Sequence, residues 1–267
     1  QPFWSLTPFL GADSAATLPV LMAGAAVACY SFLGFDAVTT LTEETKDPQR
    51  TLPRAILLIT LIGGLIFVVV SYFVQLAAPG HDFANPDAAA YEIARNIGGD
   101  IFVSIFLIGL VVGQFASGIA AQASGARLLY AMGRDDVLPK RWLGKLSRFG
   151  TPLGGLLLSG VVALLALTMD VLSAASFINF GAFLAFALVN LSVIFHYYLK
   201  ERRRGGMETL WFLICPLIGL GAILWLMLSL DHLAIMLGGA WLAFGLAWLV
   251  WLTRGFSRPT PELHMDG

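Results

Sequence analysis

Long apolar stretches alternate with short polar segments along the whole chain. Each stretch is long enough to cross a bilayer, which takes about 20 residues of helix at about 1.5 Å rise per residue. Because lipid offers no hydrogen-bond partner to a free backbone group, such segments are helical. The pattern predicts seven transmembrane helices, over residues 17–41, 53–77, 100–129, 152–169, 171–199, 208–230 and 232–252.

The first stretch is interrupted by polar and flexible residues at membrane depth. Its sequence CYSFLGFDAV, residues 29–38, places Gly34 and Asp36 inside an otherwise apolar run. A glycine inside a helix costs about 1 kcal/mol relative to alanine, and an ionised aspartate at the bilayer centre costs about 2.5 to 3.5 kcal/mol. Both costs are explained if the helix breaks here, with one half ending near residues 30–33 and the other beginning near Asp36. We therefore predict a broken helix in this span.

A break would leave carbonyl groups without backbone partners at the end of the first half, on residues such as Tyr30, Ser31 and Phe32. These groups carry the partial negative charge of a helix C-terminus and could bind an ammonium group or a cation. Discontinuous helices of this kind form the midplane sites of secondary transporters. Two other interpretations stay open: Asp36 as the N-cap of the second half, and Gly34 as a place of close helix packing.

Basic residues lie almost entirely on one side of the predicted membrane helices. With seven alternating spans, every Lys and Arg except Arg95 falls in one set of loops or in the C-terminal tail. This asymmetry predicts that the Arg-rich side and the C-terminus are cytoplasmic. The opposite side is acidic. Its acids would either concentrate cations or are simply tolerated there, because Asp and Glu contribute little to topology.

Two loops show helical patterns of their own. The outer loop, residues 79–99, contains AAAYEIARNIGG, which predicts a short helix ending at glycines. The inner loop, residues 132–150, contains PKRWLGKL, in which Trp142 and Leu146 have helical spacing between basic residues. This second pattern indicates a short interfacial helix that anchors the loop at the membrane surface.

The composition excludes an ordinary soluble domain. The mean hydropathy is +0.80, and 58% of the residues are hydrophobic while only 12% are charged. The two cysteines, Cys29 and Cys215, lie in apolar runs without paired spacing, so we expect no disulfide framework, no metal site and no cofactor. The chain begins QPFW without a recognisable signal peptide, and we expect it to be a piece of a longer protein.

Three stretches of the chain carry a family resemblance: YSFLGFDAVTTLTEETKDPQRTLPRAI, ASGARLLYAMGRDDVLP and SFINFGAFLAFALVNLSVI. The first resembles the sixth transmembrane segment, and the loop after it, of transporters of the amino acid–polyamine–organocation (APC) superfamily. The second resembles the end of the eighth segment with its following loop, and the third resembles the tenth. Within the family, TLTEET before a Pro-containing basic loop is most similar to the putrescine importers.

This resemblance implies an all-α membrane fold, the C-terminal part of a transporter with five-plus-five inverted repeats. The seven spans would be segments six to twelve. Residues 1–199 would hold the second inverted repeat with the preceding outer loop, and residues 200–267 the last two transmembrane helices and a cytoplasmic tail. The first half, which in the family holds the other broken helix and often a proton-coupling residue, is missing from this sequence. We therefore expect that the chain alone does not transport.

The resemblance also implies roles for residues of the broken span. Tyr30 stands where the family has an aromatic gate over the substrate, and Gly34 allows the break. Asp36 is an acid that members use near the gate or the site. The backbone carbonyls that would bind the substrate amine are those of Ser31, Phe32 and Leu33.

Other residues have roles that the resemblance leaves open. Glu44, at the inner end of the broken helix, would be part of an inner gate of ion pairs or of a solvated helix end. Gln114 and Ser117 lie at membrane depth, where they would line a cavity or bond a neighbouring helix. Three residues of the tenth segment lie around its inward-facing part: Phe177, Asn179 and Phe180. We expect the two phenylalanines to pack in the core.

We expect the chain to belong to a secondary active transporter of amines or amino acids and not to an enzyme. The leading hypothesis is transport of putrescine or another polyamine by proton symport. The alternative is proton-coupled or exchange transport of a cationic or neutral amino acid, and a non-transporting membrane scaffold is a second class. The expected partners are a small amine or amino acid, protons, the lipid bilayer and the missing N-terminal half, with no nucleic acid. The expected location is the cell membrane, crossed several times.

Two other membrane functions are disfavoured by the residues themselves. An intramembrane aspartyl protease needs two carboxylates close together, so that one holds a proton. Asp36 has no acidic partner at membrane depth, since Asp170 lies at the end of a span on the other side. A channel needs a pore lined by polar rings, and the spans show none.

Overall fold

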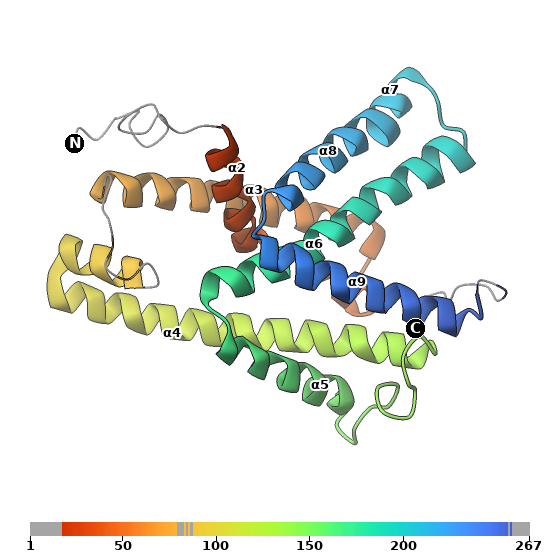
Figure 1. Ribbon diagram of the computed structural model, residues 1–267, viewed down its shortest axis with the longest axis horizontal. Helices are drawn as coiled ribbons and strands as arrows, with labels where there is room; N and C mark the ends of the chain where they lie inside the picture. Colours follow the sequence, from red (N-terminus) through yellow and green to blue (C-terminus); the bar gives the residue numbers. More distant parts are fainter. Residues whose placement is uncertain (1–17, 79–82, 84, 86–87, 256, 258–267) are drawn as a thin grey trace. The chain divides into compact units, whose positions relative to one another are not determined.

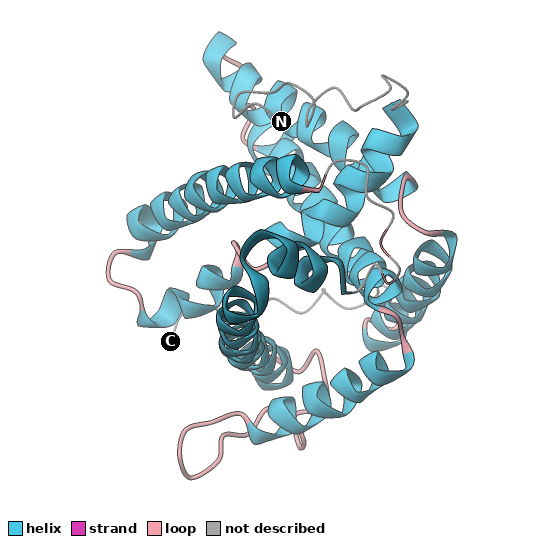
Figure 2. Cartoon of the chain, turned by 90° about the vertical axis from the view of Figure 1, so that its left-hand side faces the viewer, coloured by secondary structure: helices cyan, strands magenta, loops and turns pink. Residues whose placement is uncertain are grey.

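The computed structural model describes residues 18–78, 83, 85, 88–255 and 257, without the side chains of residues 43, 44 and 165. Within these residues the chain consists of helices joined by loops and turns, and no strand occurs (Figure 1 and Figure 2). In the described part of the chain, six helices are long and apolar enough to cross a membrane, and a shorter apolar helix, Leu153–Thr168, lies at the predicted fourth span. The prediction of an all-α membrane protein is confirmed.

The first span is broken, as predicted. α2 (Leu18–Ala28) passes into a 3₁₀ turn, η1 (Cys29–Phe32). After residues 33–36 the chain continues as a second 3₁₀ helix, η2 (Ala37–Glu44). A 3₁₀ helix is wound more tightly than an α-helix, and mid-helix stretches of it often mark a functional hinge or local strain.

The chain divides into two compact units, and the division falls at the break. Of the described residues, unit 1 contains 34–168 and unit 2 contains 18–33 and 169–255. The first half of the broken helix is therefore part of unit 2, and its second half is part of unit 1.

Unit 1 is built on two long helices, α3 (Pro48–Ala77) and α4 (Ala89–Arg134), and both contact η2. α3 begins at Pro48 and not at Pro53 as predicted. Proline suits the first helical turn, because the N–H groups there have no partner within the helix and the N–H that proline lacks is not needed. In α4, Gly99 has φ +67° and ψ −163°, which separates a short helical segment from the span. The predicted short helix that ends at glycines is confirmed.

The packing of α4 against α5 (Leu153–Ala163) is close and includes one interhelical hydrogen bond. A Cβ atom at Gly155 would lie 2.7 Å from the carbonyl oxygen of Ala126, so the two backbones nearly touch. Gln122 Nε2 donates to the carbonyl oxygen of Leu156 at 2.9 Å. Small residues and polar side chains hold helices together in lipid, because apolar side chains gain nothing by leaving an apolar solvent. α5 ends in the 3₁₀ helix η4 (Leu164–Thr168).

The prediction of an interfacial helix in the inner loop is wrong. PKRWLGKL forms a turn, in which the N–H of Trp142 donates to the carbonyl of Pro139 at 3.1 Å. A Cβ atom at Gly144 would lie 2.7 Å from the carbonyl oxygen of Gly133 at the end of α4. The loop backbone therefore packs directly on α4, and this contact has no signature in the spacing of apolar residues.

Unit 2 is organised around α6 (Val171–Val193), which packs against α2, α8 (Cys215–Leu228) and α9 (His232–Leu252). Figure 1 shows α6 in green beside the blue α8 and α9. α6 continues into a π-helical segment, η5 (Ile194–Lys200), and the chain returns through α7 (Gly206–Thr209) and the π-helical η6 (Leu210–Ile214). The buried core cluster consists of Ala26, Phe180, Phe183 and Leu230.

Two acids on the predicted outer side are helix caps. Asp170 Oδ2 accepts a hydrogen bond from the N–H of Ser173 at 3.1 Å at the start of α6. Asp231 Oδ2 accepts one from the N–H of Leu233 at 3.0 Å at the start of α9. A carboxylate at this position satisfies backbone donors that have no partner within the helix. These two residues therefore have a structural role whether or not the surface also attracts cations.

Candidate functional site

The break in the first span depends on the backbone of two residues. Leu33 is extended, with φ −62° and ψ 135°. Gly34 has φ +103°, a conformation that glycine adopts readily and other residues rarely do. A Cβ atom at Gly34 would meet nothing within 4 Å among the described residues. The glycine is therefore explained by backbone conformation, and the alternative of close helix packing has no neighbour to support it there.

The end of η1 offers backbone carbonyls, although fewer than predicted. The carbonyl of Tyr30 accepts a hydrogen bond from the N–H of Leu33 at 3.1 Å, so its predicted lack of a partner is wrong. Within the described part of the chain, the carbonyls of Ser31 and Leu33 accept no hydrogen bond. Carbonyls at a helix C-terminus carry partial negative charge, so these two groups suit an ammonium ligand. Tyr30, the residue before Ser31, is 45% exposed.

Asp36 stands at the N-cap position of η2, but its side chain makes no capping hydrogen bond. The carbonyl of Asp36 accepts the first bond of the 3₁₀ helix from the N–H of Thr39 at 2.9 Å, and a second bond from the Thr39 hydroxyl at 2.7 Å. Thr40, Thr42 and Thr45 each donate a side-chain hydroxyl to a carbonyl three or four residues earlier. Asp36 is exposed, and its carboxylate has no partner among the described residues.

The inner end of the broken helix is described only in part. Glu44 is the last residue of η2, and its side chain lies outside the described residues. Beyond it, Arg50 Nε lies 3.9 Å from Asp47 Oδ2, and both side chains are largely exposed. An exposed pair of this length contributes little to stability. The inner gate assigned to Glu44 therefore stays a prediction.

Two glutamines of the third span, Gln114 and Gln122, lie beside α5. A groove of about 490 Å³ runs along α4 and α5, and Gln114 and Gln122 both line it. The hydrogen bond to the neighbouring helix comes from Gln122 and not from Gln114 or Ser117, which the sequence had singled out. Gln122 lies eight residues after Gln114 in the same helix, at a spacing that keeps both on one face. That shared face was the signal that could have identified it.

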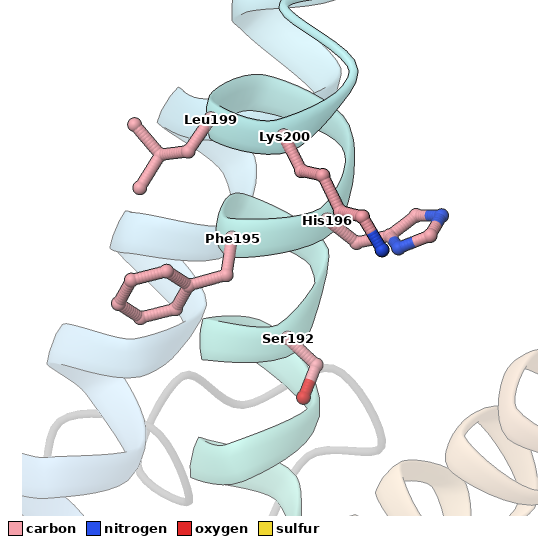
Figure 3. A pocket seen from close by; sticks show the side chains of 5 residues that line it. All are labelled: Ser192, Phe195, His196, Leu199 and Lys200. Carbon is pink, nitrogen blue, oxygen red and sulfur yellow. The ribbon is translucent and has the colours of Figure 1, made fainter.

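A second groove, of about 580 Å³, lies at the end of α6 and along η5. Figure 3 shows Phe195 and Leu199 on one side of the helix, and Ser192, His196 and Lys200 on the other. His196 Nε2 lies 3.1 Å from Glu201 Oε1. All five lining residues come from one continuous helical segment, so the groove is an open surface and lacks the enclosure of a small-molecule site.

Asn179, whose role the resemblance left open, is fully buried in unit 2. Its Nδ2 donates to the carbonyl oxygen of Ala26 at 2.9 Å, across 153 residues of sequence. Phe180 is buried in the core cluster, as expected. Phe177 lines an apolar groove between α6 and α9 together with Trp241, so the expected core position is confirmed for Phe180 alone.

These features define a class of protein. A multi-pass membrane protein with a span that is broken at a glycine has the discontinuous-helix architecture of secondary transporters. The family model described as "Amino acid permease" matches residues 3–262. The chain belongs to this family, whose members are transporters and not enzymes.

Relatives within the family agree with the resemblance. The chain is 40% identical over 265 residues to the low-affinity putrescine importer PlaP of Escherichia coli, covering 98% of this chain and 57% of that protein. It is 37% identical over 182 residues to the probable low-affinity putrescine importer PlaP of Klebsiella pneumoniae, covering 67% of this chain and 92% of that protein. The methylthioribose transporter of Bacillus subtilis is 27% identical over 232 residues, or 86% of this chain and 48% of that protein. The chain thus spans little more than half of the length of the Escherichia coli relative.

Proposed function

We propose that this chain forms part of a secondary active transporter that carries putrescine or another polyamine across the cell membrane by proton symport. The observation that carries the proposal is the break at Leu33 and Gly34, where the carbonyls of Ser31 and Leu33 have no hydrogen bond among the described residues. The 40% identity to a putrescine importer supports the choice of substrate.

In this proposal the amine is bound by the end of η1. The carbonyls of Ser31 and Leu33 accept hydrogen bonds from one ammonium group, and the aromatic ring of Tyr30 covers it. Asp36 supplies a full negative charge. A diamine that leaves water needs such partners, because an unpaired charge is costly in an apolar medium. The substrate carries no carboxylate, so this half of the site needs no positive group to receive one.

The remaining parts of the transport cycle follow from the family. Alternating access would move the broken helices against a static scaffold, and Glu44 would belong to an inner gate. Segments that the relatives possess outside the aligned part would supply the other broken helix and a proton-coupling residue. Residues 1–199 would form the second inverted repeat and residues 200–267 the last two helices and tail. The C-terminus would be cytoplasmic, on the basic side.

An amino acid is the alternative substrate. The observation in its favour is the matching family model, whose description is "Amino acid permease". The carbonyls of Ser31 and Leu33 would then bind the α-ammonium group, and Asp36 would contribute only for a cationic amino acid.

The test is uptake by the full-length product of the gene that encodes this chain, in membrane vesicles under an imposed proton gradient. Labelled putrescine, arginine and a neutral amino acid are compared in the wild type, Asp36→Asn and Asp47→Asn. Asp47 is a matched control because it is an exposed aspartate with φ +48°, which asparagine also tolerates.

The proposal predicts saturable, gradient-dependent putrescine uptake that Asp36→Asn abolishes and Asp47→Asn retains. Uptake of amino acids alone would replace polyamine transport by the alternative. Correct insertion without uptake of any of the three compounds would favour a non-transporting scaffold.

A further inference from the structure

We propose that Asn179 of α6 is a positioning residue for the broken helix. Its side chain bonds the carbonyl of Ala26, close to the residue at which α2 changes into η1. This bond sets the position of the end of η1. The effect on substrate rests on the proposed function, whereas the effect on the helix does not.

The contact on which this inference rests is a buried hydrogen bond between two distant parts of unit 2. Asn179 Nδ2 donates to the carbonyl oxygen of Ala26 at 2.9 Å, and both residues are 0% exposed. A hydrogen bond in such a low-dielectric environment is stronger than in water, and a buried group that loses its partner is correspondingly costly. The bond therefore constrains α2 relative to α6.

The bonded carbonyl lies at the change of winding. α2 ends at Ala28, and η1 follows without interruption. In a continuous α-helix the carbonyl of Ala26 would accept from the N–H of Tyr30. In α2 each carbonyl bonds the N–H four residues ahead, and in η1 it bonds the N–H three residues ahead. Where one pattern changes into the other, one carbonyl is left without a backbone N–H donor. The amide of Asn179 supplies a donor at this place, which favours the tighter winding over a longer α-helix.

The other end of the same amide supports this interpretation. Asn179 Oδ1 is buried and has no hydrogen-bond partner among the described residues. Turning the amide over would place Oδ1 against the carbonyl of Ala26, two acceptors with no proton between them. An unpartnered buried acceptor is unfavourable, and a leucine of similar size would avoid it. The asparagine is therefore explained by the bond that it donates and not by packing.

The position of η1 follows from this bond. η1 packs against α6, and Cys29, its first residue, packs on the core cluster that contains Ala26 and Phe180. The carbonyls of Ser31 and Leu33 lie within one turn beyond Cys29. Loss of the donor at Asn179 would let α2 extend or rotate, and would displace the carbonyls to which we assign the substrate amine.

Asn179→Leu tests the structural step, and Asn190→Leu is its matched control. Asn190 lies on the same helix, but its Nδ2 donates at 2.9 Å to the carbonyl of Phe186 within α6 itself. Cys29 is a free, half-buried thiol at the start of η1 and serves as the reporter, with the other free cysteine removed as Cys215→Ser. The readout is the rate at which a membrane-permeant maleimide modifies Cys29 in the full-length gene product in membranes.

Asn179→Leu should raise that rate by about fivefold or more, because a lost buried hydrogen bond shifts a local equilibrium by such a factor. Asn190→Leu should leave it unchanged. Asn179→Ser, which is smaller and too short to reach Ala26, should act like Asn179→Leu and serves if the leucine variant does not insert. Wild-type labelling rates in both Asn179 variants would overturn the inference.

Uptake kinetics in the same variants separate this inference from the proposed function. For a substrate that the wild type takes up, both Asn179 variants should raise KM several-fold with a smaller change in the maximal rate. An unchanged KM would overturn the role of Asn179 in positioning the site. Faster labelling of Cys29 in a protein whose wild type takes up neither putrescine nor amino acids would overturn the proposed function and leave the positioning of the helix intact.

Discussion

Phe180 of α6 occupies the space that a side chain at Gly238 of α9 would need. A Cβ atom at Gly238 would overlap the ring of Phe180, which belongs to the core cluster and is only 6% exposed. Gly238→Ala should therefore lower the stability of the protein by about 1–3 kcal/mol, the usual cost of overpacking a core. A lower Tm of the purified protein in detergent is the expected measurement.

Gly239→Ala is the control for this prediction. A Cβ atom at Gly239 meets nothing within 4 Å, although the residue is the next one in α9. Its Tm should equal or slightly exceed that of the wild type, because alanine favours a helix over glycine. Equal Tm values for the two variants would show that Phe180 does not depend on Gly238.

Gly34→Ala should weaken substrate binding without creating a clash. The φ of +103° is unfavourable for alanine, at a cost of about 1–3 kcal/mol, whereas the surrounding space is open. The backbone would relax and displace the carbonyl of Leu33. A several-fold rise in the KM for uptake is expected, with normal insertion in the membrane.

Gly34→Leu should act in the same way and more strongly, and Gly24→Ala is the control. Gly24 lies in α2, has no positive φ and has open space around it. Normal substrate binding by correctly inserted Gly34→Leu would argue against a substrate site at the break.

Gln122→Leu should loosen α4 from α5. The variant loses the 2.9 Å hydrogen bond from Nε2 to the carbonyl of Leu156. Interhelical bonds of this type are worth about 0.6 kcal/mol on average and about 1.7 kcal/mol at most in membranes. The expected result is a small fall in Tm. Gln114→Leu, in the same groove, should have less effect, and a larger fall for Gln114→Leu would contradict this assignment.

Asp170 should make the stability of unit 2 dependent on acid pH. Hydrogen bonds from Ser173 lower the pKa of its carboxyl group. A group whose pKa is lower in the folded state stabilises the fold above its unfolded pKa, which is about 3.9 for aspartate, and this contribution is lost as the pH falls through the folded pKa. Asn caps a helix nearly as well but does not titrate here.

Tm values of the wild type and Asp170→Asn at several pH values provide the check. The wild type should be slightly more stable at neutral pH, and the difference should shrink as the pH falls below about 4 and disappear only below the lowered pKa of Asp170. Ser173→Ala should reduce the pH dependence, because part of the shift comes from that side chain. A difference between wild type and Asp170→Asn that does not change with pH would contradict the prediction.

The positions of the spans and of the break in the first one could be predicted from the residues alone. Span length and hydropathy are local properties, so each predicted stretch lies at an apolar helix of the structure. The break was also local, because Gly34 is unsuited to a helix interior whatever surrounds it. Asp170 and Asp231 could have been recognised as caps for the same reason, since each stands directly before an apolar run.

The contacts between distant residues could not be predicted from the sequence and are seen only in the folded protein. The bond from Asn179 to Ala26 joins positions 153 residues apart, and the contact of Gly238 with Phe180 joins two helices. The turn in PKRWLGKL depends on the approach of Gly144 to Gly133. The pairing of the Tyr30 carbonyl likewise depends on the winding of η1, which the bond at Ala26 favours. Apolar periodicity reports which face of a helix is buried. It does not report the partner against which that face packs, and in lipid these partners are selected by small residues and single polar side chains.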